Sequence, residues 1–236
     1  MRHLGRKDRK QLKKLNERSL ITYKNPKSPI AEQFRTIRTN IQFASIDEEM
    51  KSIMVTSAGP GEGKSTTAAN LAIVLTQQGK RVLLVDADMR KPTMHYTFQL
   101  TNIQGLTNVL TKQTNLANAI SRTLVPDLDV LTSGPIPPNP SELLDSKAMR
   151  DLMKEAQSYY DVVLYDCPPV LAVTDAQIMA NNTQGIVLVV RSGFTEKEAA
   201  QHAKERILKA NGKLLGVVLN GKKMKEGQYY YYYANK

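Results

Sequence analysis

The chain has 236 residues, a formal net charge of +11 and 41% apolar residues, which fits one folded α/β domain and excludes fibrous or wholly disordered proteins. The single cysteine, Cys167, cannot form an internal disulfide, and no Cys/His spacing predicts a structural metal site. The longest apolar runs fall far short of the roughly 18 residues that span a bilayer, and no apolar stretch follows the basic N-terminus as in a secretory signal. We therefore expect a protein of the reducing cytosol.

Much of the positive charge lies near the two ends of the sequence. Residues 1–18 carry eight Lys or Arg against two Asp or Glu, and residues 222–236 carry four against one. Basic ends of this kind bind anionic lipid, nucleic acid or acidic proteins, or serve only solubility, and composition leaves these alternatives open. We expect residues 1–28 to be a basic N-terminal segment, 29–221 the folded domain, and 222–236 a flexible tail containing Tyr229, Tyr230, Tyr231, Tyr232 and Tyr233.

The first predicted element is a helix over residues 29–43, with Ser28 as its N-cap and Pro29 at its first position. Its expected buried stripe consists of Ile30, Phe34, Ile37 and Ile41. A second group of side chains falls within a 120° arc that lies opposite much of this stripe, namely Glu32, Arg35 and Arg38. These three either pair within the helix or contact a neighbouring subunit. Because two arginines face one glutamate, we favour the intersubunit contact.

After residue 50, short apolar runs alternate with longer amphipathic segments, which predicts βα units on a parallel sheet. The expected strands are 52–56, 81–86, 129–132, 161–166, 185–191 and 214–220. Capping boxes mark two helix starts and glycines mark two helix ends, at Thr174 with Gln177, Thr195 with Glu198, Gly79 and Gly212. The proline-rich residues 133–140 are expected to form a loop. Right-handed crossovers then predict a doubly wound, mainly parallel α/β sheet with the three-layer fold of P-loop NTPases.

Residues 53–66 combine a strand, a glycine-rich turn and a helix start, which is the context that a phosphate-binding loop requires. Glycines let successive N–H groups point at phosphate oxygens, Lys64 at the surface of the crevice supplies a positive charge, and Ser65 offers a hydroxyl to Mg²⁺. Ala58 stands where the pattern has its first glycine, which is tolerable if its φ is negative. The predicted nucleotide-binding residues are Gly59, Pro60, Gly61, Glu62, Gly63, Lys64, Ser65 and Thr66.

Acidic residues end two of the predicted strands. Asp86 and Asp88 follow the apolar run 82–85, and Asp166 follows the run 162–164 and Tyr165. Because the carboxyl ends of parallel strands gather at the ligand crevice, we expect all three carboxylates to face the metal and the γ-phosphate.

Together these residues resemble the bacterial tyrosine kinases of the capsule and exopolysaccharide systems, known as BY-kinases. The resemblance covers nearly the whole chain. The chain is similar to the Firmicute form of the family, in which a separate membrane protein activates the kinase. It is carried by the loop 58–66, the LLVDADMR motif of residues 83–90 with Lys91-Pro92, the DCPP motif of 166–169, the E-x-x-R-x-x-R motif of 32–38, the loop 134–144 and the terminal tyrosines.

The resemblance implies an ATP- and Mg²⁺-dependent protein-tyrosine kinase. If the resemblance holds, Lys64 holds the phosphates, Asp86 accepts the tyrosine proton, and Asn220 contacts the adenine. Mg²⁺ would be organised by Ser65, Asp88 and Asp166. Positioning and charge neutralisation would supply most of the rate, because a carboxylate is a weak base for a phenol of pKa about 10.

The resemblance also implies partners. The kinase would form a closed homo-oligomeric ring in which Glu32, Arg35 and Arg38 dock on a neighbour and the tail tyrosines accept phosphate between subunits. Further partners would be a membrane activator with a cytoplasmic segment, protein substrates phosphorylated on tyrosine, and a cognate tyrosine phosphatase. The protein would be cytoplasmic, recruited to the inner face of the membrane by its activator, and would regulate exopolysaccharide and capsule synthesis.

Two other functions compete with this interpretation. A P-loop ATPase switch of the partition or division-site type carries a second lysine five positions before the P-loop lysine, where this chain has Gly59. A membrane-targeted member would also need an amphipathic C-terminal helix, which the tyrosine-rich tail cannot provide. A nucleic-acid-binding module would use the basic ends and tyrosines but leaves the P-loop unexplained, so nucleic acid is not an expected partner.

Overall fold

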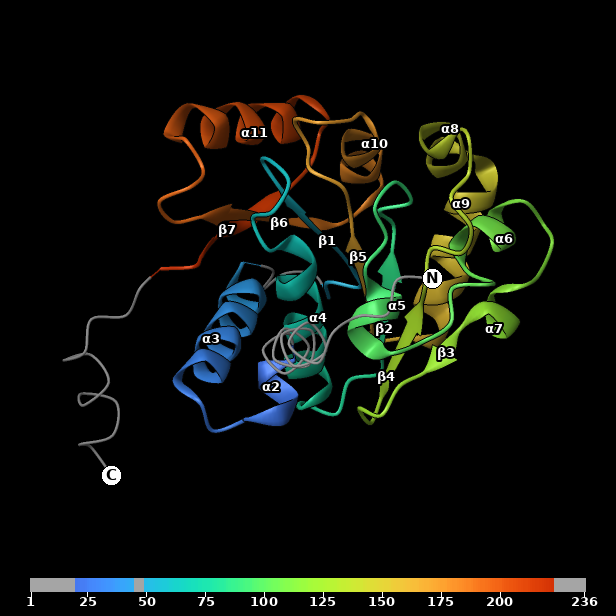
Figure 1. The fold of residues 1–236 in the computed structure, drawn as a ribbon, viewed down its shortest axis with the longest axis horizontal. Coiled ribbons are helices and arrows are strands. Elements are labelled where there is room, and N and C mark those ends of the chain that lie inside the picture. Colours follow the sequence, from blue (N-terminus) through green and yellow to red (C-terminus); the bar gives the residue numbers. More distant parts are fainter. Residues whose placement is uncertain (1–19, 45–48, 223–236) are drawn as a thin grey trace, which may run out of the picture.

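A computed structural model describes residues 20–44 and 49–222, and the tail tyrosines lie outside these ranges. Figure 1 shows a twisted sheet with helices packed on both faces. Its strands are β1 (Ser52–Ser57), β2 (Val82–Asp86), β3 (Ser121–Arg122), β4 (Leu128–Leu131), β5 (Val162–Asp166), β6 (Gly185–Arg191) and β7 (Leu214–Asn220). In this part of the chain the seven strands have the order β3-β4-β2-β5-β1-β6-β7, and only the β3–β4 pair is antiparallel. The predicted doubly wound, mainly parallel sheet is confirmed.

The two faces of the sheet carry separate hydrophobic clusters because successive strand residues point to opposite sides. On β2, Leu84 belongs to one cluster and Leu83 to the other. One face is covered by α2 (Ile21–Lys24), α3 (Pro29–Phe43), α4 (Lys64–Thr76) and α5 (Met94–Phe98). The other is covered by α6 (Leu106–Leu110), α7 (Leu116–Ala119), α8 (Pro140–Asp145), α9 (Lys147–Tyr159), α10 (Asp175–Asn182) and α11 (Lys197–Lys209). The result is the expected three-layer architecture.

All six predicted strands form, each with ends within one residue of the expected ones. The strand that the sequence did not reveal is β3, which has only two residues and therefore no readable alternation. The proline-rich loop ends one residue earlier than expected, because Pro140 occupies the first turn of α8. Proline fits there since the first helical N–H groups have no intrahelical acceptor.

Helix α3 has the predicted bounds, and the Ser28 side chain accepts a hydrogen bond from the Ala31 N–H at 3.1 Å. The predicted stripe is confirmed for Ile41, which is buried, and for Phe34 and Ile37, which are partly buried against the same cluster. It is wrong at Ile30, which is 50% exposed, and it missed the fully buried Ala31. The buried face is set by packing against α4 and β7, which the apolar spacing of α3 alone does not specify.

The charged residues of α3 also have partners within this chain. The Arg35 guanidinium pairs with the Glu32 carboxylate at 2.7 Å and donates to the Pro26 carbonyl at 3.0 Å. The Arg38 guanidinium donates to the Val74 carbonyl at 2.7 Å, near the C-terminus of α4 where the helix dipole favours a cation. The surplus positive charge that suggested a neighbouring subunit is therefore used inside the domain, and docking through these residues stays a prediction.

The predicted helix boundaries are partly wrong. Thr174 makes no side-chain capping bond at the start of α10, and α11 begins at Lys197 with Glu196 as its N-cap, so Thr195 lies outside the helix. Gly79 does adopt the left-handed conformation, with φ 77°, just after α4. After α11, however, Asn211 takes the left-handed conformation with φ 56°, in place of Gly212. Asparagine tolerates this conformation better than most residues.

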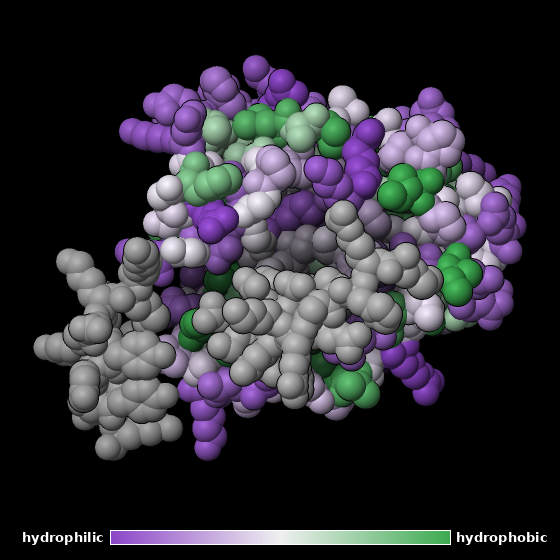
Figure 2. All heavy atoms as spheres, viewed as in Figure 1, coloured by the Kyte–Doolittle hydropathy of each residue, from purple (hydrophilic) through white to green (hydrophobic). Residues whose placement is uncertain are grey.

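Charged side chains project along the outer edge of α11 at the top of Figure 2, and apolar residues appear between them and elsewhere as separate patches. Within residues 20–44 and 49–222, none of the helices has the length and apolar character required to cross a membrane.

Gly212 is predicted to be needed for space and not for backbone conformation. An added Cβ would lie 2.5 Å from Ile186 Cδ1, so Gly212→Ala should lower the free energy of unfolding by ~1–3 kcal/mol through overpacking. The matched control is Gly216→Ala on β7, where no heavy atom lies within 4 Å of the added Cβ and little change is expected. Urea denaturation measures both variants. Equal losses in the two would contradict the packing explanation.

Candidate active site

The phosphate-binding loop follows β1, whose two neighbours in the sheet are β5 and β6. Gly61 and Gly63 adopt the left-handed conformation, with φ 78° and 95°, and Gly63 is the N-cap of α4. Ala58 keeps a negative φ and is therefore tolerated, as the sequence required. Gly59 differs from the other two glycines because its φ is not positive and an added Cβ would make only ordinary contacts. The loop conformation thus depends on Gly61 and Gly63.

The loop presents unengaged donors at the start of a long helix. In the described part of the chain, the backbone N–H groups of Gly61, Glu62 and Gly63 donate to no protein acceptor. They lie at the N-terminal end of α4, where the helix dipole favours negative charge. Free N–H groups in this position form a ready anion-binding site, which fits the predicted phosphate site.

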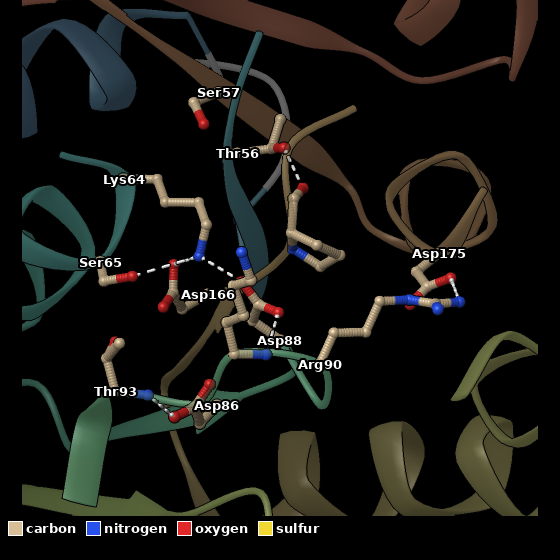
Figure 3. Close-up of polar contacts among 12 residues, drawn as sticks. Thr56, Ser57, Lys64, Ser65, Asp86, Asp88, Arg90, Thr93, Asp166 and Asp175 are labelled. Atoms are coloured by element: carbon tan, nitrogen blue, oxygen red, sulfur yellow. Dashed lines mark hydrogen bonds and ion pairs between the residues drawn. The ribbon is translucent and has the colours of Figure 1, made fainter. Parts of the chain in front are cut away.

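Lys64 lies between two carboxylates that come from different strands (Figure 3). Its ammonium is 2.8 Å from Asp88 Oδ2 and 3.4 Å from Asp166 Oδ1, and it donates to Ser65 Oγ at 3.2 Å. The Lys64 side chain is only 12% exposed, so the expectation that it lies at the surface of the crevice is wrong. Burial alone would lower the pKa of Lys64, but Asp166 and Asp88 outweigh burial and raise it above its usual value.

Asp86 is fully buried, as is Asp166. It lies opposite Asp166 in the β2–β5 register, and its Oδ2 accepts the N–H groups of Thr93 and Met94, each at 2.9 Å. Its Oδ1 is buried and has no partner among the described residues. Burial first, and the neighbouring Asp166 second, raise the pKa of Asp86 to about 7. A protonated and an ionised Asp86 are therefore both accessible near neutral pH.

The expectation that the three carboxylates face a metal and the γ-phosphate stays a prediction. The described residues contain no cluster of three His, Cys, Asp or Glu side chains arranged for a metal ion. Lys64 lies between Asp88 and Asp166, and backbone N–H groups hold Asp86. Magnesium at nucleotide sites needs only one or two carboxylates, because phosphates and water complete its coordination. The residues fit such an ion: Asp166 Oδ2 is buried without a partner among the described residues, and the Ser65 hydroxyl accepts a hydrogen bond from the Lys64 ammonium that also pairs with Asp166.

Sequence reasoning missed Asp175, which anchors the loop after β2. The Arg90 guanidinium forms two hydrogen bonds with the fully buried Asp175 carboxylate, at 2.9 and 3.0 Å (Figure 3). Within the same loop, the Lys91 N–H donates to Asp88 Oδ1 at 3.0 Å. Asp88 is therefore held in a loop that α10 fixes. The signal was an acidic residue in the first turn of a helix, which reads in sequence as ordinary helix capping.

Asn220 ends β7 directly behind the phosphate-binding loop. Its Nδ2 donates to the Glu62 carbonyl at 2.9 Å. A cavity of about 660 Å³ begins beside it, between α3 and β7, and reaches Thr67 on α4. This position next to the loop is compatible with the predicted adenine contact, which stays a prediction.

Comparison with known proteins places this geometry in a family. Residues 50–209 match the family model described as an AAA domain. The tyrosine-protein kinase YwqD of Bacillus subtilis is 57% identical over 93% of both chains. This chain belongs to the bacterial tyrosine kinases. The putative tyrosine-protein kinase CapB of Staphylococcus aureus is 43% identical, over 91% of this chain and 95% of CapB. The solved structure of the chimerical protein CapA2B2 has a TM-score of 0.85 and 50% identity, over 87% of this chain and 91% of that one.

Membership of the bacterial tyrosine kinases confirms the resemblance read from the sequence and agrees with the absence of a second lysine before the loop, where Gly59 stands. Cys167 follows Asp166 in this site and is fully buried. Burial, and next to it the charge of Asp166, raise the pKa of the Cys167 thiol well above its usual value. A thiol in that state is a poor nucleophile.

Lys64 is predicted to stabilise the fold as well as the site. Lys64→Met leaves two buried carboxylates without their cation and should lower the free energy of unfolding by ~2–4 kcal/mol at neutral pH. Adding Asp88→Asn to that variant removes one unpaired charge and should recover part of the loss.

The control for this prediction is Lys80→Met, because Lys80 pairs with Glu49 at 3.7 Å and the two side chains are 30% and 63% exposed. That change should stay within ~0.5 kcal/mol. Urea denaturation followed by circular dichroism measures all three variants. A Lys64→Met protein as stable as the wild type would show that the two acids do not depend on this cation.

Proposed function

We propose that the chain is an ATP-dependent protein-tyrosine kinase that phosphorylates its own C-terminal tyrosines between subunits. The observation that carries the proposal is the position of Lys64, between Asp88 and Asp166 and beside the unengaged N–H groups of the loop. Cationic and N–H donors recognise phosphates, and carboxylates beside them supply a place for Mg²⁺. The names of the similar proteins add tyrosine as the acceptor.

In this proposal the phosphates of ATP bind the backbone N–H groups of the loop and the Lys64 ammonium. Ser65, Asp88 and Asp166 would hold Mg²⁺, which neutralises phosphate charge when bound. Asn220 borders the space for the adenine. Catalysis then depends on positioning and charge neutralisation, because the protein itself forms no covalent bond during phosphoryl transfer.

Asp86 is the proposed acceptor of the tyrosine proton. Its pKa of about 7 is closer to that of a phenol than the pKa of an ordinary aspartate is. Its Oδ2 is occupied by the N–H groups of Thr93 and Met94, so Oδ1 is the atom with capacity for a proton. A buried base with one free oxygen is suited to take a proton from a single direction.

The partners of the kinase follow from the family and remain proposals. A homo-oligomeric ring would bring the tail residues 222–236 of one subunit to the site of the next. Glu32 and Arg35 form an exposed ion pair and are available to a neighbour, whereas Arg38 already binds the end of α4. A membrane protein would recruit and activate the kinase at the inner face of the membrane, where it would regulate exopolysaccharide and capsule synthesis, opposed by a tyrosine phosphatase.

Transfer between subunits is tested by mixing two chains, neither of which can phosphorylate its own tail. One chain carries Lys64→Met and the full tail, and the other has an intact site but ends at residue 222. Labelled ATP should place phosphotyrosine on the Lys64→Met chain, because the partner's site reaches its tail. Each chain alone is the control and should stay unlabelled on the tail. Free phosphate without phosphotyrosine would instead indicate an ATPase switch, and an unlabelled Lys64→Met chain, under conditions in which the wild-type chain becomes labelled, would exclude transfer in trans.

Asp86→Asn is expected to reduce phosphotransfer at least ~10²-fold while nucleotide affinity changes less than about threefold. The amide cannot take the tyrosine proton, but its oxygen can still accept the N–H groups of Thr93 and Met94. The matched control is Asp145→Asn, a carboxylate at the exposed end of α8. Steady-state kinetics with titration calorimetry of MgADP separates the two quantities. Equal losses in binding and transfer would make Asp86 a phosphate- or metal-site residue instead.

A further inference from the structure

Glu62 lies within the phosphate-binding loop, yet its carboxylate is engaged on the protein side. The residue is only 3% exposed. Oε2 accepts the Ala58 N–H at 2.9 Å, and Oε1 accepts the Thr195 hydroxyl at 2.8 Å. Glu62 forms no ion pair with a Lys or Arg side chain in the part of the chain that the structure describes. A carboxylate buried without a cation depends on such hydrogen bonds to remain charged.

Thr195 connects this carboxylate to the next strand of the sheet. It lies between β6 and α11, and its Oγ1 accepts the Arg191 N–H at 2.7 Å while donating to Glu62. Arg191 makes a second contact, since it donates to the Gly61 carbonyl at 3.2 Å. The end of β6 and the segment after it therefore each contact the loop once, and Asn220 at the end of β7 contacts it again.

The two bonds of Glu62 fix the size of the loop. The bond to Ala58 joins residue 58 to residue 62 and closes the turn between the strand and the helix. The bond to Thr195 then fixes the closed turn against the sheet. Because these contacts satisfy the Ala58 N–H and the carbonyls of Gly61 and Glu62, the N–H groups of Gly61, Glu62 and Gly63 remain for a ligand.

We propose that Glu62 is a positioning residue that, through Thr195, holds the phosphate-binding loop in its nucleotide-binding shape. The proposal rests on the proposed function, in which this loop binds ATP. A direct role for the Glu62 charge is not supported, because both carboxylate oxygens are already bonded to the protein and a negative group facing phosphate would repel it. Loss of the Glu62–Thr195 link, called the Thr195 brace below, should lower nucleotide affinity, since a loosened loop must be ordered again at each binding event.

The test uses the full chain and MgADP as the probe, with KM for ATP and kcat measured beside it. Glu62→Ala removes both bonds and should weaken MgADP binding and raise KM about tenfold, with a smaller change in kcat. Thr195→Val removes one of the two Glu62 bonds, together with the bond from the Arg191 N–H, and should act in the same direction by about threefold. Because both changes break the same link, the double variant should bind no more weakly than Glu62→Ala.

Two conservative variants serve as matched controls. Thr195→Ser keeps the hydroxyl and should bind like the wild type. Glu62→Gln should lose less than Glu62→Ala, since the amide oxygen can accept the Ala58 N–H and the amide nitrogen can donate to Thr195 Oγ1. Thermal unfolding without nucleotide checks each variant, and Thr195→Val carries the test if Glu62→Ala does not fold.

The outcomes separate this inference from the proposed function. If the wild type fails to bind MgADP, or Lys64→Met binds it equally well, the nucleotide site itself is wrong. If the wild type binds and Thr195→Val binds as tightly, the Thr195 brace is refuted. The same holds if Glu62→Gln is as weak as Glu62→Ala while Thr195→Val is unchanged, because that pattern assigns the effect to the charge of Glu62.

Discussion

The ion pairs of Lys64 with Asp88 and Asp166 are the interaction on which the rest of the site depends. The sheet brings the ends of β2 and β5 together, and it thereby places three acids within a buried space. Carboxylates taken out of water lose their hydration and repel each other, and burial raises the pKa of Asp166 even beside Lys64. The Lys64 ammonium, whose side chain is only 12% exposed, supplies the positive charge that compensates for these carboxylates. The sheet places the carboxylates close together, and the ammonium of Lys64, at the start of α4, offsets their repulsion.

Everything around this pair restricts how the acids can move. Asp88 is held by a loop that Arg90 ties to Asp175, and Asp86 is held by the first N–H groups of the segment leading into α5. What remains unsatisfied is informative, because buried polar atoms in native proteins nearly always have partners. Asp86 Oδ1 and Asp166 Oδ2 have none among the described residues. Two adjacent strands thus end in oxygens that no described residue engages and that a ligand, an ion or a proton could engage.

The sequence predicted those features that local patterns determine. Apolar runs and glycines gave the strands, α3 and the loop to within a residue, and strand order brought the acids to one edge. It failed where a side chain's partner is distant in sequence. Thr195 was expected in a capping box with Glu198, and Asp175 was not singled out, but Thr195 binds Glu62 and Asp175 binds Arg90. The exposure of Ile30 and the burial of Lys64 were missed for the same reason, since packing against other elements decides both.

The site has two halves that are held from different directions. The phosphate-binding loop is tied to the ends of β6 and β7 and to Thr195 after β6, and the acidic loop is tied to α10. Lys64 links the halves directly through its ion pairs with both acids. A nucleotide that draws the Lys64 ammonium toward its phosphates weakens those pairs and leaves buried negative charge opposite more negative charge. A divalent cation restores the balance, so charge alone makes nucleotide binding and Mg²⁺ binding depend on each other.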